Sequence, residues 1–352
     1  MNKKTTLFKS LALALLTGVF TAGPLSAQVV GSYAPLSTGA TSNSGVAAPS
    51  GYTWSEVQND TGNTTESNTS GGFSGHYNTA GTISFAVGDD FTVPEGLTWG
   101  ITGFEFFGYQ TGYTGTTIPI DALRIAVYNV DPATPGATPI LGNLTANVLN
   151  GAQSGDAQMY RIFNSAVPTP SAPGTTRKIW RFVGNLSGSL TAGTYWVVAQ
   201  VHALNDSSIF FPGATIPGVR LVPGANGKQN IIATTDATAT LGWTNLIDGG
   251  NPAAAPDVAV AVPFNVRGTV LANQDQEVVS LSLFPNPVSS SLNINSSVPV
   301  TGIELFDLTG RKVKSIKGDD IRTVVLSELP SGTYMVNLKT VSGRLVKKIV
   351  KQ

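Results

Sequence analysis

The sequence contains no cysteine and only two histidines, and 12% of its 352 residues are charged. The absence of cysteine excludes disulfide bonds and cysteine-ligated zinc. Basic and acidic side chains balance at 21 each, but residues 28–270 carry 8 of the basic and 14 of the acidic ones. Such a mildly acidic surface does not attract a phosphate backbone, so nucleic-acid binding is not expected.

The first 27 residues have the order of a secretory signal peptide. Three lysines precede an apolar run, and a Gly-Pro pair then leads to small residues: Lys3, Lys4 and Lys9, then residues 11–16, then residues 23–27. We expect the Sec machinery to export the chain and signal peptidase to cut between Ala27 and Gln28. The apolar run is shorter than the about 20 residues that cross a bilayer. No later stretch is apolar enough to span one, so no transmembrane segment is predicted in the mature protein.

Residues 28–82 form an N-terminal segment rich in small polar residues. Serine, threonine, asparagine and glycine make up 32 of the 52 residues from 31 to 82. A segment of this composition buries little apolar surface. Trp54, Phe73 and Tyr77 nevertheless predict that parts of it dock on the rest of the chain.

The next section, residues 83–270, alternates apolar and polar side chains with the period of a β-strand. The alternating apolar positions fall into four runs: Leu123, Ile125 and Val127; Trp180 and Phe182; Tyr195, Val197, Ala199 and Val201; Val258, Val260, Val262, Phe264 and Val266. Turn-forming clusters such as residues 131–136 separate the runs, and no segment has convincing helical periodicity. Many short strands with frequent turns predict an all-β fold with a jelly-roll-like β-sandwich.

A polar linker at residues 271–279 and a change of composition mark a second domain at 280–352. Residues 271–352 hold seven lysines, and glycines at turn positions separate short apolar runs. We expect strands at 281–284, 292–294, 303–306, 313–316, 323–326, 334–338 and 345–350. This pattern predicts a small immunoglobulin-like C-terminal β-sandwich. Lys347, Lys348 and Lys351 on its last strand would discourage edge-to-edge pairing.

Two short motifs recur in both domains. Residues 102–107 resemble 301–306, and residues 190–195 resemble 329–334. The spacing between the paired motifs differs, so this is not a tandem repeat. We expect two sandwiches that reuse similar strand chemistry.

The C-terminal domain carries four ordered motifs that run to the end of the sequence. Each has a local physical interpretation, since prolines end a strand and glycines permit tight turns. The motif residues are Phe284, Pro285, Asn286 and Pro287, then Gly310 within 303–311, then Gly332 and Tyr334 within 329–336, and finally Lys347 and Lys348 within 347–351. In these motifs the tail resembles the type A sorting domain of the type IX secretion system of Bacteroidetes-type bacteria.

This resemblance implies a route and a set of partners. The chain would enter the periplasm, fold there and cross the outer membrane through the type IX translocon. A sortase would then remove the tail and release the body or attach it to surface lipopolysaccharide. The expected location is therefore the cell surface or the medium.

The middle of the chain also resembles a known kind of secreted module, although the motifs that carry this resemblance are less specific than those of the tail. Residues 89–94 and 107–112, followed by residues 192–196 and 263–264, are similar to a secreted bacterial β-sandwich module of undefined activity. The resemblance covers residues 83–270 and implies no catalytic residues.

The sequence offers few sets of residues that could form a catalytic site. His76 and His202 have no Gly-x-Ser-x-Gly elbow beside them, which argues against a serine hydrolase. Glycoside hydrolysis needs two carboxylates across one bond; Glu105, Asp121 and the Asp89-Asp90 pair are candidates. Adjacent Asp89 and Asp90 should point to opposite faces of a strand. The sequence predicts no catalytic residue, and an enzyme is the less favoured class.

No cofactor is predicted, although loop oxygens could hold a structural Ca²⁺. One candidate set is Asp60 with Asn63 and Glu66, and the other is Asp89, Asp90 and Asp131. The alternative is that these side chains satisfy local backbone donors, as Asp and Asn in loops usually do.

Tyr109 and Tyr113 bracket a Gln-Thr-Gly turn directly after an apolar strand. Aromatic rings beside amide and hydroxyl groups suit sugar binding, while the alternative is that they cover the rim of the sandwich. We therefore predict a non-enzymatic binding or adhesion protein with a glycan as its candidate ligand. Two other functions stay open, namely a secreted glycan-acting hydrolase and a purely structural surface protein.

Overall fold

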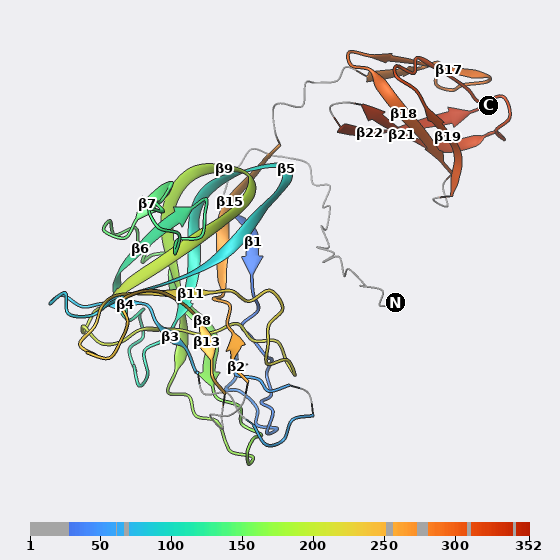
Figure 1. Ribbon diagram of the computed structural model, residues 1–352. Coiled ribbons are helices and arrows are strands. Elements are labelled where there is room, and N and C mark those ends of the chain that lie inside the picture. The colour runs from blue at the N-terminus through green and yellow to red at the C-terminus, as the bar shows by residue number, and fades with distance from the viewer. Residues whose placement is uncertain are drawn as a thin grey trace. The chain divides into compact units, whose positions relative to one another are not determined.

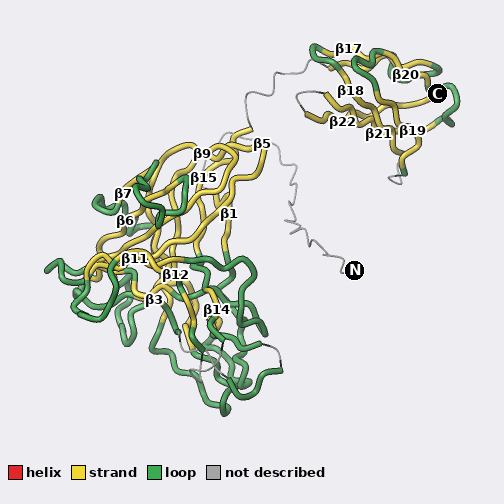
Figure 2. Tube along the Cα trace, viewed as in Figure 1, coloured by secondary structure: helices red, strands yellow, loops and turns green. Residues whose placement is uncertain are grey.

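The computed structural model describes residues 28–60, 62–66, 70–250, 256–272, 281–307, 311–340 and 343–352. Every regular element in these residues is a strand (Figure 2), so the predicted all-β fold is confirmed. The chain divides into two compact units, one ending at Val270 and the other beginning at Leu271. Ala27, residues 273–279 of the predicted linker and Gly310 lie outside the described residues.

The first unit contains fifteen strands among its described residues (Figure 1). They are β1 (Gln28–Tyr33), β2 (Thr53–Glu56), β3 (Phe73–Ser74), β4 (His76–Tyr77), β5 (Ser84–Gly108), β6 (Ile120–Tyr128), β7 (Leu141–Asn143), β8 (Gly155–Ile162), β9 (Lys178–Ala203), β10 (Phe210–Phe211), β11 (Lys228–Ala233), β12 (Gly242–Asn245), β13 (Ile247–Asp248), β14 (Val258–Ala259) and β15 (Phe264–Ala272). Because β15 runs to Ala272, the first two residues of the predicted linker belong to a strand.

The long antiparallel pair β5–β9 is the frame of this unit. The pairing extends from Val87 opposite Ala199 to Gly108 opposite Trp180. The main sheet has the order β1-β15-β5-β4-β9-β6-β7, and β8 and β11 pair with β9 and β5 outside that path. Figure 2 shows most loops of the unit gathered at one end of these strands. The fold is a β-sandwich, and its jelly-roll character stays a prediction.

The alternating runs predicted the buried face of β6 and β9 correctly. Leu123, Ile125 and Val127 lie in the main core with Val197 and Val201. The opposite face is also covered, by a smaller cluster made of Ala86, Ala126, Tyr128, Trp196 and Val198. Both faces of these central strands are therefore buried over part of their length.

The run from Val258 to Val266 is not one strand, contrary to the prediction. It divides into β14, which pairs with β13, and β15, which begins at Phe264. Pro263 cannot donate to a ladder, and the Val262 N–H donates to Asp89 Oδ2 at 2.6 Å instead of to a strand. The alternation is lost here because Ala261, Val262, Pro263 and Phe264 are all buried.

The N-terminal segment is an integral part of the first unit, although its composition predicts little burial. Trp54 is 1% exposed, and the Glu56 carboxylate beside it is fully buried. Glu56 Oε1 accepts from the Ser165 N–H and hydroxyl, each at 2.7 Å, and Oε2 accepts from the Asn43 N–H at 2.7 Å. Hydrogen bonds to one carboxylate therefore join two loops far apart in the sequence, a contribution that composition alone does not reveal.

The second unit contains seven strands among its described residues. They are β16 (Leu281–Phe284), β17 (Ser291–Ser296), β18 (Val300–Phe306), β19 (Lys312–Lys317), β20 (Thr323–Val325), β21 (Gly332–Thr340) and β22 (Gly343–Lys351). Each coincides with an expected strand to within a few residues. They form a three-stranded sheet, β16-β17-β20, and a four-stranded sheet, β19-β18-β21-β22. Side chains of both sheets contribute to one apolar core; its immunoglobulin-like character stays a prediction.

The motif shared by residues 190–195 and 329–334 makes the same hydrogen bond in both units. Tyr195 OH donates to the carbonyl of Thr191 at 2.9 Å, and Tyr334 OH donates to the carbonyl of Pro330 at 2.9 Å. Both tyrosines are buried. A buried phenol needs such a partner. In both units the motif therefore ties the start of a core strand to the turn that precedes it.

Candidate functional site

Two loops of the first unit enclose an open groove of about 440 Å³. One loop follows β5 and the other follows β9. The groove is lined by amides, hydroxyls, glycine backbone and two aromatic rings: Gln110, Thr111, Gly112, Tyr113, Thr114, Gly115, Asn205, Ser207, Ser208 and Phe210. No charged side chain is among these lining residues.

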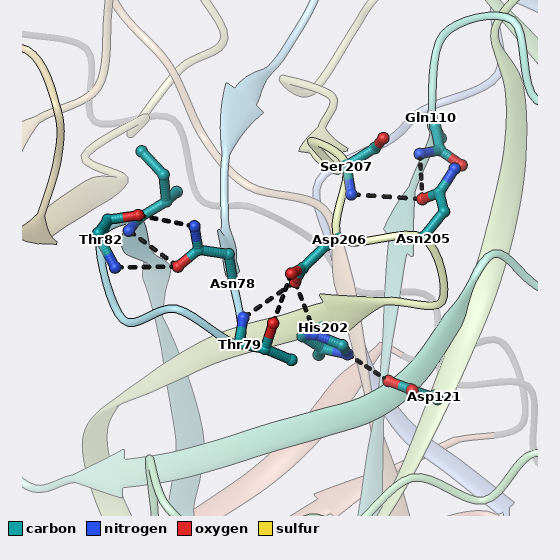
Figure 3. A network of polar contacts seen from close by, with 10 residues as sticks. Asn78, Thr79, Thr82, Gln110, Asp121, His202, Asn205, Asp206 and Ser207 are labelled. Carbon is teal, nitrogen blue, oxygen red and sulfur yellow. Dashed lines mark hydrogen bonds and ion pairs between the residues drawn. The ribbon is translucent and has the colours of Figure 1, made fainter.

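Backbone and side-chain bonds hold the two loops together. Tyr109 and Phe210 exchange two backbone hydrogen bonds of 2.9 Å each. Next to that bridge, Gln110 Nε2 donates to Asn205 Oδ1 at 2.9 Å (Figure 3). Gln110 is 6% exposed, and its Oε1 has no hydrogen-bond partner among the described residues. These bonds fix the two loops relative to each other at the groove.

Behind the second loop, His202 lies between two aspartates (Figure 3). Its Nδ1 is 2.6 Å from Asp121 Oδ1 and its Nε2 is 2.9 Å from Asp206 Oδ1. The two carboxylates thus engage both nitrogens of the ring and fix its orientation. The Thr79 N–H and hydroxyl donate to the same Asp206, and these bonds lower the pKa of its carboxyl. The cluster anchors the loop that carries Asn205.

This arrangement does not support a serine hydrolase. Both nitrogens of His202 are engaged by carboxylates, so neither can activate a hydroxyl. His76 is buried, and burial lowers its pKa. Because His76 is 5% exposed and both nitrogens of His202 are engaged, the structure offers no histidine among the described residues that meets a substrate hydroxyl as a base.

The structure separates the two tyrosines that the sequence paired. Tyr109 is 3% exposed and its ring stacks on Phe210, with centroids 5.7 Å apart, so it covers the sandwich instead of facing solvent. Tyr113 is half-buried, lines the groove and meets Trp180 edge to face at 6.0 Å. Only Tyr113 is placed to contact a ligand.

Loop residues considered as calcium ligands accept hydrogen bonds from backbone N–H groups, and Asp131 also forms an ion pair. Asp60 Oδ1 accepts from the Arg220 N–H, and Asn63 Oδ1 accepts from the Glu66 N–H. Asp131 accepts from the Ala133 N–H and pairs with Lys228 at 3.2 Å. In the part of the chain that the structure describes, no three His, Asp or Glu side chains are grouped to hold a metal ion.

Glu105 forms ion pairs with two arginines and is not an exposed acid. It is 7% exposed and lies 3.6 Å from Arg267 Nε and 3.9 Å from Arg181 Nη1, while Asn265 donates to it at 3.0 Å. With its oxygens held by these partners, Glu105 is not available to a substrate.

Asp89 and Asp90 line a second pocket, of about 320 Å³, together with Tyr33 and apolar side chains. The strand parity is kept as predicted, because Asp89 stands opposite Val197 of the main core and Asp90 stands opposite Trp196 of the smaller cluster. Asp89 Oδ1 also accepts from the Asp90 N–H at 2.8 Å. Asp89 is 5% exposed, and burial raises its pKa to about 7 although two N–H donors act in the opposite direction.

In the second unit, the structure brings the first and last sorting motifs together. Asn286 Oδ1 accepts from the Val350 N–H at 2.8 Å, and Asn286 Nδ2 donates to the Lys348 carbonyl at 3.2 Å. β16 ends at Phe284, directly before Pro285, as expected, and Pro287 follows the asparagine. Asn286 therefore fastens the start of the domain to its last strand.

The remaining motif residues lie on the four-stranded sheet. Gly332 opens β21, and Tyr334 packs in the core. Lys347 and Lys348 are exposed on β22, the outer strand of that sheet, which agrees with their expected position at an edge. Lys351 is buried instead, in a parallel bridge with Val288 that covers this end of the edge.

Sequence reasoning missed the second wall of the groove. Asn205, Ser207 and Ser208 stand in a polar turn directly after the long alternating run of β9. A polar turn at the end of a buried strand was the available signal. Nothing local indicated that this turn would meet Gln110, because the two lie 95 residues apart.

Residues 282–352 match the family described as the secretion system C-terminal sorting domain. No curated protein matches the chain. The described residues include no helix that is long and apolar enough to cross a membrane. The resemblance proposed for residues 83–270 receives no support from these comparisons. The match to the tail supports this chain as a cargo of the type IX secretion system, exported out of the cell or onto its surface.

Proposed function

We propose that residues 28–270 form a binding module for neutral glycans, which the sorting tail delivers to the cell surface or the medium. The observation that carries this proposal is the uncharged groove between the loops after β5 and β9. Its volume of about 440 Å³ falls within the usual range for small-ligand sites.

The chemistry of the lining favours a sugar over other ligands. Hydroxyls and amides can exchange hydrogen bonds with sugar hydroxyls, and the Tyr113 ring can pack on the C–H face of a pyranose. A charged ligand would find no counter-charge on the lining residues. The neutral groove therefore favours a neutral oligosaccharide over a uronate or a phosphorylated molecule.

The finer steps of export belong to the same proposal. Cleavage after Ala27 would release the chain from the Sec pathway, and a sortase would remove the tail after passage through the translocon. The body would then be released or attached to lipopolysaccharide.

A secreted glycan hydrolase is the second candidate, because of Asp89 and Asp90. A carboxyl whose pKa is about 7 beside a second carboxyl has the chemistry of an acid–base pair. Asp89 is nearly covered and accepts two backbone N–H bonds, so it is poorly placed to reach a glycosidic oxygen. Binding without turnover is therefore the favoured activity.

One experiment separates the candidates. Residues 28–270 are applied to a glycan array, and the same protein is incubated with a panel of polysaccharides. We expect saturable binding to neutral glycans and no release of reducing ends. Turnover that disappears in Asp89→Asn would favour the hydrolase. The absence of both activities, with the protein abundant at the surface, would favour a structural protein.

A further inference from the structure

Two buried arginines line one narrow cavity in the first unit. The cavity has a volume of about 20 Å³, and its walls include Gln58, Arg161, Thr215, Arg220, Asp248 and Val260. The two arginines come from β8 and from the loop after β10, and Asp248 ends β13. The candidate glycan groove shares no residue with it.

Arg161 is 2% exposed and bonds only to neutral acceptors. Its Nε donates to the Gly71 carbonyl at 2.7 Å, and its Nη1 donates to Ser55 Oγ at 3.0 Å. Burial lowers the pKa of Arg161 to about 10, which leaves the guanidinium charged at neutral pH. The Asp248 carboxylate raises this pKa through space, but burial lowers it more. A further anion nearby would reduce the remaining cost of the buried charge.

Arg220 has donors without acceptors. Its side chain is 3% exposed, and its Nε and Nη2 have no hydrogen-bond partner among the described residues. Its one ionic contact joins Nη1 to Glu66 Oε2 at 3.7 Å, which is longer than a hydrogen bond. Because unsatisfied buried donors are costly, these two N–H groups indicate a further partner.

The charge and the size of the cavity limit what that partner is. The lining carries two guanidinium groups against one carboxylate, and that carboxylate already accepts from the Gly250 N–H at 3.0 Å. Water would satisfy the donors but would bring no negative charge to them, and the Glu66 carboxylate reaches only Nη1 of Arg220, not its Nε or Nη2. A space of this size holds a particle close to one water molecule, so sulfate and phosphate do not fit.

We propose that this cavity binds a monovalent anion of the size of chloride, held by Arg220 Nε and Nη2 and by the charge of Arg161. The anion would join β8 to the loop after β10. In a chain without cysteine, it would stabilise this part of the unit without a covalent link.

Crystals of the full mature chain soaked in bromide test the proposal, because bromide scatters anomalously and replaces chloride. We expect an anomalous peak inside the cavity next to Arg220. Peaks confined to the surface, or cavity density that remains that of water, would overturn the anion site. This readout does not depend on any variant folding.

Thermal unfolding gives an independent readout through mass action. All five tryptophans lie in the first unit, so their fluorescence reports on its unfolding alone. We expect the midpoint to rise when chloride replaces gluconate at constant ionic strength. Arg220→Gln should lose this rise. Arg124→Gln should keep it, because Arg124 also has an unpartnered buried Nε but does not line the cavity. Equal responses in both variants would contradict the site.

Discussion

Gln110 Nε2 donates to Asn205 Oδ1 at 2.9 Å and thereby joins the two loops that form the candidate groove. The bond is partly buried, and a double-mutant cycle can measure its strength. We expect Gln110→Ala and Asn205→Ala each to lower the free energy of unfolding, with a coupling of about 1 kcal/mol. Urea unfolding followed by tryptophan fluorescence gives the four values. A coupling near zero would mean that the bond does not hold the loops.

Asp89 should make stability depend on pH. Its pKa is raised from 3.8 to about 7, so between these values the folded state holds a proton that the unfolded state has lost. The sign follows from linkage: the free energy of unfolding falls as the pH rises from about 4 to about 7, by up to about 1.4 kcal/mol per pH unit.

The Asp89→Asn variant removes this contribution. Comparing urea unfolding at pH 5 and pH 7, we expect the wild type to lose about 2 kcal/mol more than the variant on going to the higher pH. Asp90→Asn is the matched control and should keep most of the slope. If Asp89→Asn retained the full slope, another group would be responsible for it.

The paired tyrosines should have similar energetic value in the two units. Tyr195→Phe and Tyr334→Phe each remove one hydroxyl whose partner is a backbone carbonyl four residues earlier. We expect each change to destabilise its own unit by about 1 kcal/mol and to leave the other unit unaffected. Tryptophan fluorescence reports on the first unit, and amide hydrogen exchange measures both. Destabilisation of both units by one substitution would contradict their independence.

The strands of the tail could be predicted because its signals are local. Glycine and proline turns bound short apolar runs, and each predicted run from 281–284 to 345–350 coincides with a strand. In the first unit, alternation predicted the buried faces around Val127 and Val197. It failed at Pro263, where a tertiary contact between Val262 and Asp89 replaces strand pairing.

The candidate site could be predicted only in part. Tyr113 was identified from an aromatic residue in a glycine-rich turn. For Tyr109 the sequence left open ligand contact or coverage of the sandwich rim, and the structure shows coverage, because its ring stacks on Phe210, 101 positions further along the chain. Long-range contacts of this kind also bury Glu56 in a segment whose composition predicts exposure.

Deletion of residues 280–352 should prevent export beyond the periplasm, because the sorting motifs lie in this unit. Fractionation of a competent host, followed by immunoblotting, measures the location. The matched control is the full chain with Tyr113→Ala, which leaves the tail intact and should reach the surface or the medium normally. Normal surface levels of the truncated chain would contradict the assigned role of the tail.

Titration of an array-selected neutral oligosaccharide into residues 28–270 tests binding in the groove most directly. We expect saturable heat, an affinity insensitive to salt because no charged side chain lines the groove, and a several-fold weaker affinity in Tyr113→Ala. That loss corresponds to the about 1 kcal/mol of one aromatic contact. Tyr52→Ala is the control, since Tyr52 is also half-buried but lies outside the groove and should leave the affinity unchanged. Equal affinity in Tyr113→Ala and the wild type, or a steep loss of affinity with salt, would contradict the neutral-glycan groove.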